Sequence, residues 1–257
     1  MKRILTIIIS TICRIICYGA NGQNVGDVYL APNPHSARWS YIETDNNGKQ
    51  IATVYCSVES IEGDALNGNL KLRVEEISVE SPKDTIKSFQ FYRFKDGEFI
   101  VDLYAAFEDS IFEGKVDSQI RNTLNERYPD LPEDKKMDVL EEIKSEFFKI
   151  SGEPRGLPRY PKVGKLPDYE FHIKMSIISM KVLGENRRIV GTESIQTEAG
   201  LFDCFILEET LTTKAMMMKD VETIKSWYAY GIGLVKETSY DKNGKLISTM
   251  LLNRVNW

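Results

Sequence analysis

The sequence predicts a mainly β fold, either a curved antiparallel sheet or a partly open β-barrel, with a two-helix insertion. Near both ends of the chain, β-branched and aromatic residues alternate with polar ones at period two, as in Leu70–Val74 and Phe89–Phe91. Only the middle of the chain places apolar residues at helical spacing. We therefore expect a single mainly β domain over residues 23–257, in which both ends contribute strands to one bent layer that the helices cover.

Residues 1–22 have the pattern of a secretory signal peptide. Lys2 and Arg3 precede an apolar run that ends at Cys17, and small residues follow at Gly19–Gly22. The run is shorter than the roughly 20 residues that span a bilayer, although a permanent membrane anchor is the alternative interpretation. We expect export, cleavage near Gly22, and a periplasmic or envelope-associated location.

Lipid anchoring at Cys17 is disfavoured by the residues before it. A lipobox has a small residue directly before the modified cysteine, whereas Ile15 and Ile16 stand there and Arg14 precedes them. Two cysteines, Cys56 and Cys204, lie beyond the leader, each in an apolar, strand-like run. They could pair in an oxidising compartment or stay as buried thiols, and two cysteines make no disulfide framework.

Composition and charge narrow the class of partner. The 257 residues are 42% hydrophobic and 28% charged, as in ordinary globular proteins, which excludes disordered and collagen-like classes. Removing residues 1–22 takes away three basic residues and no acidic one, so the formal net charge changes from −5 to −8. This net negative charge argues against binding to nucleic acid and against electrostatic docking on anionic lipid.

The first half, from Arg38 to about Tyr104, is expected to form an antiparallel meander. Residues that favour turns separate its strand-like runs, at Asp45–Lys49, Asn67–Asn69 and Lys95–Glu98.

Two helices are expected in the middle, over 116–128 and 133–149, as an insertion at about 116–150. Pro129 and Pro132 separate them, and Glu133 and Asp134 place negative charge in the first turn of the second. A proline-rich connector follows at about 153–168 and should be an extended loop, because proline lacks a backbone donor.

The strand pattern resumes at Tyr169 and continues to the C-terminus. Cys204–Leu207 is apolar on both faces, which favours a central strand covered on both sides. In the turn Asp241–Lys245, the Asn243-Gly244 pair favours type I′ geometry. The expected strands of this half are Phe171–Leu183, Arg187–Gln196, Cys204–Leu207, Ile224–Tyr230, Leu234–Tyr240 and Leu246–Asn253.

Motifs of common enzymes and cofactor sites are absent from the sequence. It has no His-Glu-x-x-His, Walker loop, nucleophile elbow or dinucleotide-binding glycine motif, and only His35 and His172 as histidines. The sequence thus predicts that the protein is not an enzyme and that it binds no cofactor and no metal. The adjacent carboxylates Glu208 and Glu209 are interpreted as a solvated face. A hydrolase that uses Asp168, Glu170 and His172 is the alternative.

Several aromatic residues could line a ligand cavity in the concave sheet, or could simply form its core and rim. Methionine and phenylalanine of the second helix would then face the same cavity. The candidate ligand-binding residues are Trp39, Tyr41, Met137, Phe147, Trp227, Tyr228 and Tyr230.

Four segments of the second half, in order and spacing, carry a family resemblance. They are Tyr160–Asp168, Val190–Glu193, Glu198–Cys204 and Trp227–Lys236. Together they resemble the TapB-like, domain-of-unknown-function 3108 type of exported bacterial proteins, best from about Pro158 to Leu252. The resemblance implies a periplasmic or envelope-associated all-β protein, often anchored as a lipoprotein, with no established enzymatic activity. We therefore predict an exported, non-enzymatic envelope protein that binds a lipid-like ligand or another envelope protein, and no nucleic acid.

Overall fold

A computed structural model describes residues 37–63, 68–83, 85–95, 98–107, 117–175, 178–215 and 218–256, so the predicted leader lies outside the described residues. The strands are β1 Arg38–Asp45, β2 Gln50–Gly63, β3 Gly68–Ser78, β4 Ile86–Lys95, β5 Glu98–Val101, β6 Phe148–Gly152, β7 Leu157–Pro158, β8 Gly164–Lys165, β9 Tyr169–Met175, β10 Ile178–Thr197, β11 Gly200–Ala215, β12 Met218–Ala229, β13 Gly233–Asp241 and β14 Leu246–Asn256. The helices are α2 Leu103–Phe107, α3 Asp117–Arg127 and α4 Glu133–Phe147.

All these strands belong to one sheet, and their recorded pairings are antiparallel. The order is β6-β9-β10-β11-β12-β13-β14-β1-β2-β3-β4-β5-β7, with β8 beside β10. The pairing of β14 with β1, from Arg38↔Asn256 to Asp45↔Ser248, joins the two ends of the chain. Among the described strands, those at the two ends of this order do not pair, so the sheet stays open. The predicted fold class is confirmed.

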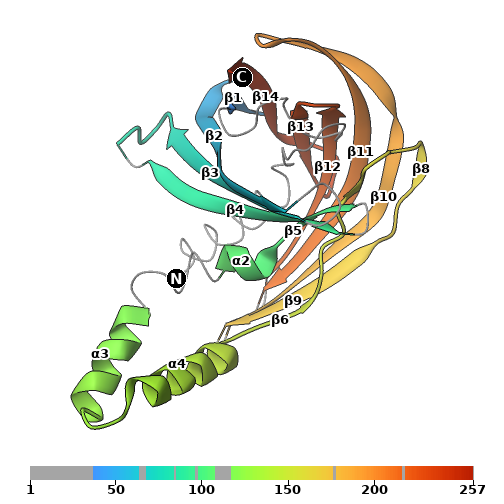
Figure 1. The fold of residues 1–257 in the computed structure, drawn as a ribbon. Helices are drawn as coiled ribbons and strands as arrows, with labels where there is room; N and C mark the ends of the chain where they lie inside the picture. Colours follow the sequence, from blue (N-terminus) through green and yellow to red (C-terminus); the bar gives the residue numbers. More distant parts are fainter. Residues whose placement is uncertain are drawn as a thin grey trace.

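The sheet curls so that its first and second halves face each other (Figure 1). The interior between them is apolar: Tyr92 of β4 stacks on Phe99 of β5 with ring centroids 4.8 Å apart, and both belong to one core cluster with Leu207 and Tyr228 of β11 and β12. A second cluster, around Phe171, lies along β9–β12.

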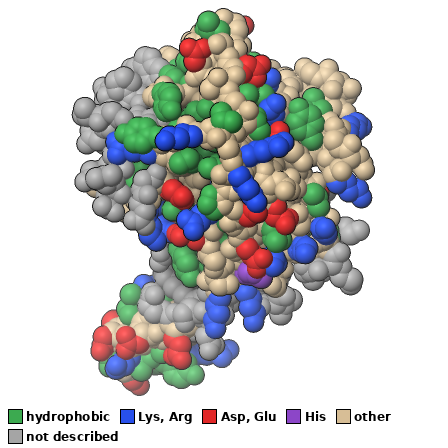
Figure 2. Space-filling model, turned by 90° about the vertical axis from the view of Figure 1, so that its right-hand side faces the viewer, with side chains coloured by type: hydrophobic (Ala, Val, Ile, Leu, Met, Phe, Trp, Pro, Cys, Tyr) green, Lys and Arg blue, Asp and Glu red, His purple; other side chains and the backbone are tan. Residues whose placement is uncertain are grey.

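The two predicted helices, α3 and α4, do not cover the concave face, contrary to the prediction. α3 and α4 project from the end of the sheet where β6 and β9 lie, and the space-filling view shows them as a separate lobe (Figures 1 and 2). Met137 of α4 is accordingly 40% exposed. The short helix α2, which contacts β4, was not predicted.

Several predicted boundaries are wrong. α4 ends at Phe147 and β6 begins at Phe148, because pairing with β9 overrides the apolar spacing that continues to Ile150. The expected run Phe171–Leu183 is divided between β9 and β10, which pair from Met175↔Ile178 onward. β10 then continues to Thr197 through the break expected before Arg187. The proline-rich connector contains the two-residue strands β7 and β8.

The turn at Asp241–Lys245 is confirmed in place but not in type. A type I′ turn needs positive φ at both central residues, and here only Gly244 (φ 77°) has it. The Asp241 carboxylate instead accepts hydrogen bonds from the backbone N–H groups of Asn243 and Lys245, at 2.8 and 2.9 Å. Asp45 makes the same contacts in its own turn.

Candidate functional site

The structure buries four of the seven candidate ligand-binding residues in the main core cluster. Trp39, Tyr41, Trp227 and Tyr228 are 7%, 2%, 4% and 3% exposed. The Tyr41 hydroxyl of β1 donates to the backbone oxygen of Leu234 in β13, at 3.0 Å. Their role in ligand binding stays a prediction.

The other three candidates do not join them. Tyr230 is 58% exposed, with its ring 6.0 Å from that of Phe205. Met137 lies on the projecting helix α4. Phe147 ends that helix, but its side chain lies outside what the structure describes.

Trp227 and Tyr228 point to opposite faces of the sheet, as neighbours on a strand do. Tyr228 stacks on Phe205 at 5.6 Å and lies on the concave side. The Trp227 indole N–H donates to Glu193 Oε2 at 2.7 Å, while the ammonium groups of Lys236 and Lys225 lie 4.6 and 5.3 Å from its ring. The two residues therefore do not line one cavity.

A buried arginine occupies the concave side instead. A bulge in β10 changes the pairing from Glu185↔Thr210 to Arg188↔Glu208, with Asn186 at φ 57°. The extra residue turns Arg187 inward, where its side chain is 3% exposed. Its Nε donates to Glu209 Oε2 at 2.9 Å, and its guanidinium lies 5.0 Å from the Tyr169 ring.

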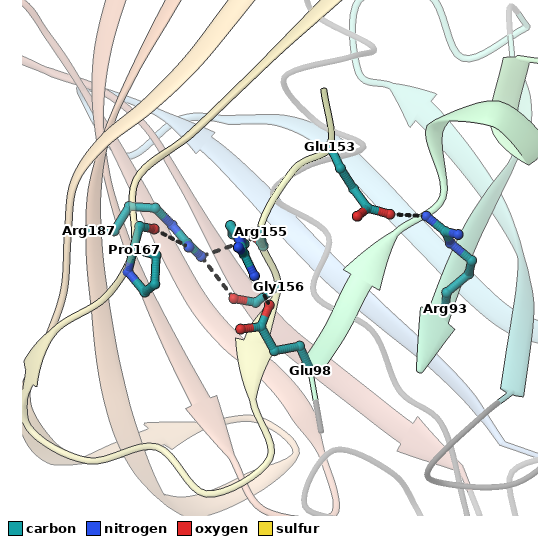
Figure 3. Close-up of polar contacts among 7 residues, drawn as sticks. All are labelled: Arg93, Glu98, Glu153, Arg155, Gly156, Pro167 and Arg187. Carbon is teal, nitrogen blue, oxygen red and sulfur yellow. Dashed lines mark hydrogen bonds and ion pairs between the residues drawn. The ribbon is translucent and has the colours of Figure 1, made fainter. Parts of the chain in front are cut away.

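The same guanidinium holds the proline-rich connector. It donates to the backbone oxygens of Pro167, Gly156 and Arg155, at 2.9, 3.0 and 3.2 Å (Figure 3). Because the sequence presents Glu208 and Glu209 as a pair of acids, the solvated-face interpretation missed this contact. The solvated-face interpretation holds for Glu208, which pairs with Arg188 on the outer face. It is wrong for Glu209, which is buried.

The connector is bound on its other side by β4 and β5. Glu153 pairs with Arg93 of β4, and Arg155 lies 3.7 Å from Glu98 of β5 (Figure 3). A side chain at Gly156 would clash with the backbone oxygen of Phe99. The connector is thus packed between the two facing parts of the sheet, and the space left among these residues is only about 40 Å³.

Two residues of the hydrolase alternative, Glu170 and His172, lie on the outer face of β9. His172 and Glu170 are each 45% exposed, with Nε2 and Oε1 2.6 Å apart, and Lys181 Nζ is 2.6 Å from the other carboxylate oxygen. Hydrogen bonds from Lys181 and then His172 lower the pKa of Glu170. Asp168 is exposed in the connector. Within the described ranges, no three His, Cys, Asp or Glu side chains are grouped so that they could hold a metal ion.

Two larger hollows open on the outer side of the sheet. One, of about 880 Å³, is lined by Lys165, Arg188, Glu208 and Lys225 among others. The other, of about 570 Å³, is lined by Arg38, Tyr55, Glu59 and Arg73 among others. Figure 2 shows Lys, Arg and acidic side chains distributed over the outer face. Both hollows are therefore bordered by charged groups.

Cys56 and Cys204 are buried and free of each other. Burial raises the pKa of both thiols, that of Cys204 to about 12, where Asp203 and Glu193 add to the effect. Thiols with raised pKa values are poor nucleophiles, so both act here as small core residues.

Comparisons with known proteins agree with this fold. Residues 154–252 match the model of the DUF3108-like family. A "putative lipoprotein" from Parabacteroides distasonis aligns with a TM-score of 0.59 and 18% identity, covering 91% of this chain and all of that one. A "putative exported protein with YmcC-like fold" from Bacteroides fragilis aligns with a TM-score of 0.58 and 14% identity, covering 90% of this chain and all of that one.

No curated protein matches the sequence. No helix in the described parts of the chain is long and apolar enough to cross a membrane. Neither the family match nor the two structures bears the TapB name. The match nevertheless confirms the predicted resemblance: residues 154–252 are similar to the DUF3108-like family.

Proposed function

We propose that this chain is an exported, non-enzymatic envelope protein that works by binding through the outer surface of its curved sheet. The observation that carries the proposal is the filling of the concave side around Arg187. Side chains and the connector fill that region and leave a space of about 40 Å³. The hollows of about 880 and 570 Å³ lie on the outer side of the sheet. A drug-sized ligand needs roughly 300 Å³ or more.

Export is supported by the leader and by two solved structures of the same fold. Residues 1–22 have a signal-peptide pattern, and the two solved structures of the same fold are described as a lipoprotein and an exported protein, each with the qualifier "putative". The absence of common catalytic motifs and the exposure of His172 favour binding over catalysis.

The test of export is the intact mass of the protein recovered from cells that express the full sequence. We expect loss of residues 1–22 and recovery in the envelope or periplasmic fraction. Recovery of the uncleaved chain in the cytoplasm would contradict the proposal.

The test of outer-surface binding is native mass spectrometry combined with lipid extraction. We expect protein without a bound lipid, because the concave side around Arg187 leaves a space of only about 40 Å³. A lipid that co-purifies in stoichiometric amount, and that is lost when Tyr228→Ala opens the interior, would instead favour a ligand held inside the sheet. The matched control is Tyr230→Ala, at an exposed position two residues away.

A further inference from the structure

We propose that a row of basic residues at one end of the outer face docks this protein on an anionic phospholipid surface. The inference goes beyond the proposed function. It rests on that function only for the envelope location, which places a bilayer near the protein. The row, called the basic row below, consists of Lys149, His172, Lys174, Lys181, Lys214 and Lys219.

Strand pairing brings these residues together from distant parts of the sequence. Lys149 of β6 pairs with Lys174 of β9, and His172, two residues before Lys174 on the same face, pairs with Lys181 of β10. Lys181 pairs with Lys214 of β11, which pairs with Lys219 of β12. Strands lie about 4.8 Å apart, so the row crosses five strands in roughly 20 Å.

The row lies on the outer face. The chain neighbours of its members, Ile173, Met180 and Val182, are buried in the second core cluster. Lys149, Lys174, Lys214 and Lys219 are exposed, and Lys181 is 31% exposed. Figure 2 shows Lys and Arg side chains low on the outer face, with acidic side chains just above them.

The positive charge of the row is only weakly compensated. Glu170 pairs with Lys181 and His172. Among the described residues, the other four lysines make no recorded ion pair. Like charges directly opposite each other destabilise a sheet, and here three such pairs stand side by side: Lys149–Lys174, Lys181–Lys214 and Lys214–Lys219. A surface of phosphate groups would relieve all three repulsions at once.

The position at one rim of the sheet suits a flat partner. Lys174 and Lys214 are the last but one residues of β9 and β11, and Lys149 and Lys219 are the second residues of β6 and β12. Met218, 40% exposed, precedes Lys219 at the same rim, but its side chain points to the other face of β12. Clustered lysines are a usual composition for contact with anionic headgroups. The net negative charge of the chain argued against such docking. That charge is an average over the whole chain, and it does not show that lysines are concentrated in the basic row.

The test is sedimentation of the purified protein with vesicles of phosphatidylglycerol mixed with phosphatidylcholine, and with vesicles of phosphatidylcholine alone. We expect binding to the first only, and weakening with added salt, since surface charges are screened. In Lys174→Glu/Lys214→Glu, binding should fall at least about twentyfold, because one lysine near an anionic surface accounts for about a fivefold change.

This variant separates binding from folding. It replaces the three Lys–Lys pairs by Lys–Glu pairs, so its melting temperature should equal or exceed that of the parent protein. The matched control, Lys95→Glu/Lys162→Glu, makes the same change in net charge at two exposed lysines outside the row and should keep most of the binding.

Three results would overturn the proposal: equal binding to both kinds of vesicle, equal loss in the two variants, or binding to a soluble acidic protein but not to the anionic vesicles. Failure of export, shown by the mass of the chain, would remove the proposed function but would leave vesicle binding intact. The two failures are therefore distinguishable.

Discussion

Arg187 and Glu209 form a buried ion pair across β10 and β11, with Nε and Oε2 2.9 Å apart and the side chains 3% and 8% exposed. The guanidinium also binds three backbone oxygens of the connector. The connector in turn pairs with β5 through β7. One side chain thus links the second half of the sheet to the distant edge formed by the first half.

Removing this arginine should destabilise the fold strongly. Arg187→Met leaves Glu209 as an unpaired buried charge and frees three carbonyls, so we expect a loss of about 3–5 kcal/mol in the free energy of unfolding. Denaturant unfolding measures it. The control Arg188→Met removes the exposed pair with Glu208 and should cost about 0–1 kcal/mol. Equal losses in the two variants would refute the role of Arg187.

The double variant Arg187→Met/Glu209→Leu should recover part of the loss, because no unpaired charge then remains in the interior. Additive losses would mean that the two side chains act independently.

Tyr41→Phe should lower stability by about 1–2 kcal/mol, since the backbone oxygen of Leu234 loses a buried donor. Tyr55→Phe is the matched control, because that ring lies on β2 with 48% of its surface exposed. Thermal unfolding compares the two. A loss for Tyr55→Phe as large as that for Tyr41→Phe would show that the hydrogen bond is unimportant.

The alternation of residues predicted most strands, because a half-buried strand needs period two wherever it lies. The turns at Asp45–Lys49 and Asp241–Lys245 were also predictable, since Asp and Gly supply the side-chain acceptor and the positive φ. The bulge at Asn186 was not. Gly184-Glu185-Asn186 fits a turn equally well, and only pairing with Thr210 and Glu208 decides between a turn and a bulge.

Side-chain grouping was the least predictable property. The lysines of the basic row are spread between positions 149 and 219, and only the register of four strand pairs brings them together. The aromatic candidates show the converse: residues that are adjacent in the sequence do not share one site. Trp227 and Tyr228 are neighbours in the sequence and both are buried, yet their side chains leave β12 on opposite faces, so they do not line one cavity.

Glu222 of β12 should make stability depend on pH. Burial first, and then the charge of Asp220, raise its pKa to about 7 from a usual value of 4.5. The protonated form is favoured in the folded state, so this contribution to stability is complete below pH 4.5 and is lost as the pH rises through 7.

Glu222→Gln should therefore raise the free energy of unfolding at pH 8 by about 1–2 kcal/mol, a figure reduced for the partial exposure of the group. It should also flatten the pH profile between 4.5 and 7. Glu80→Gln, at an exposed position, is the control. A profile unchanged by Glu222→Gln would exclude this residue as the cause.

The pairing of β1 with β14 makes one sheet from the two ends of the chain, and a cross-strand disulfide tests it most directly. In a background without Cys56 and Cys204, Thr44→Cys/Thr249→Cys should form an intramolecular disulfide, because directly paired residues have Cβ atoms about 4.5–5.5 Å apart. Thr44→Cys/Ser248→Cys, whose side chains leave opposite faces, should not. Equal cross-linking in both variants, or none in the first, would contradict a single sheet.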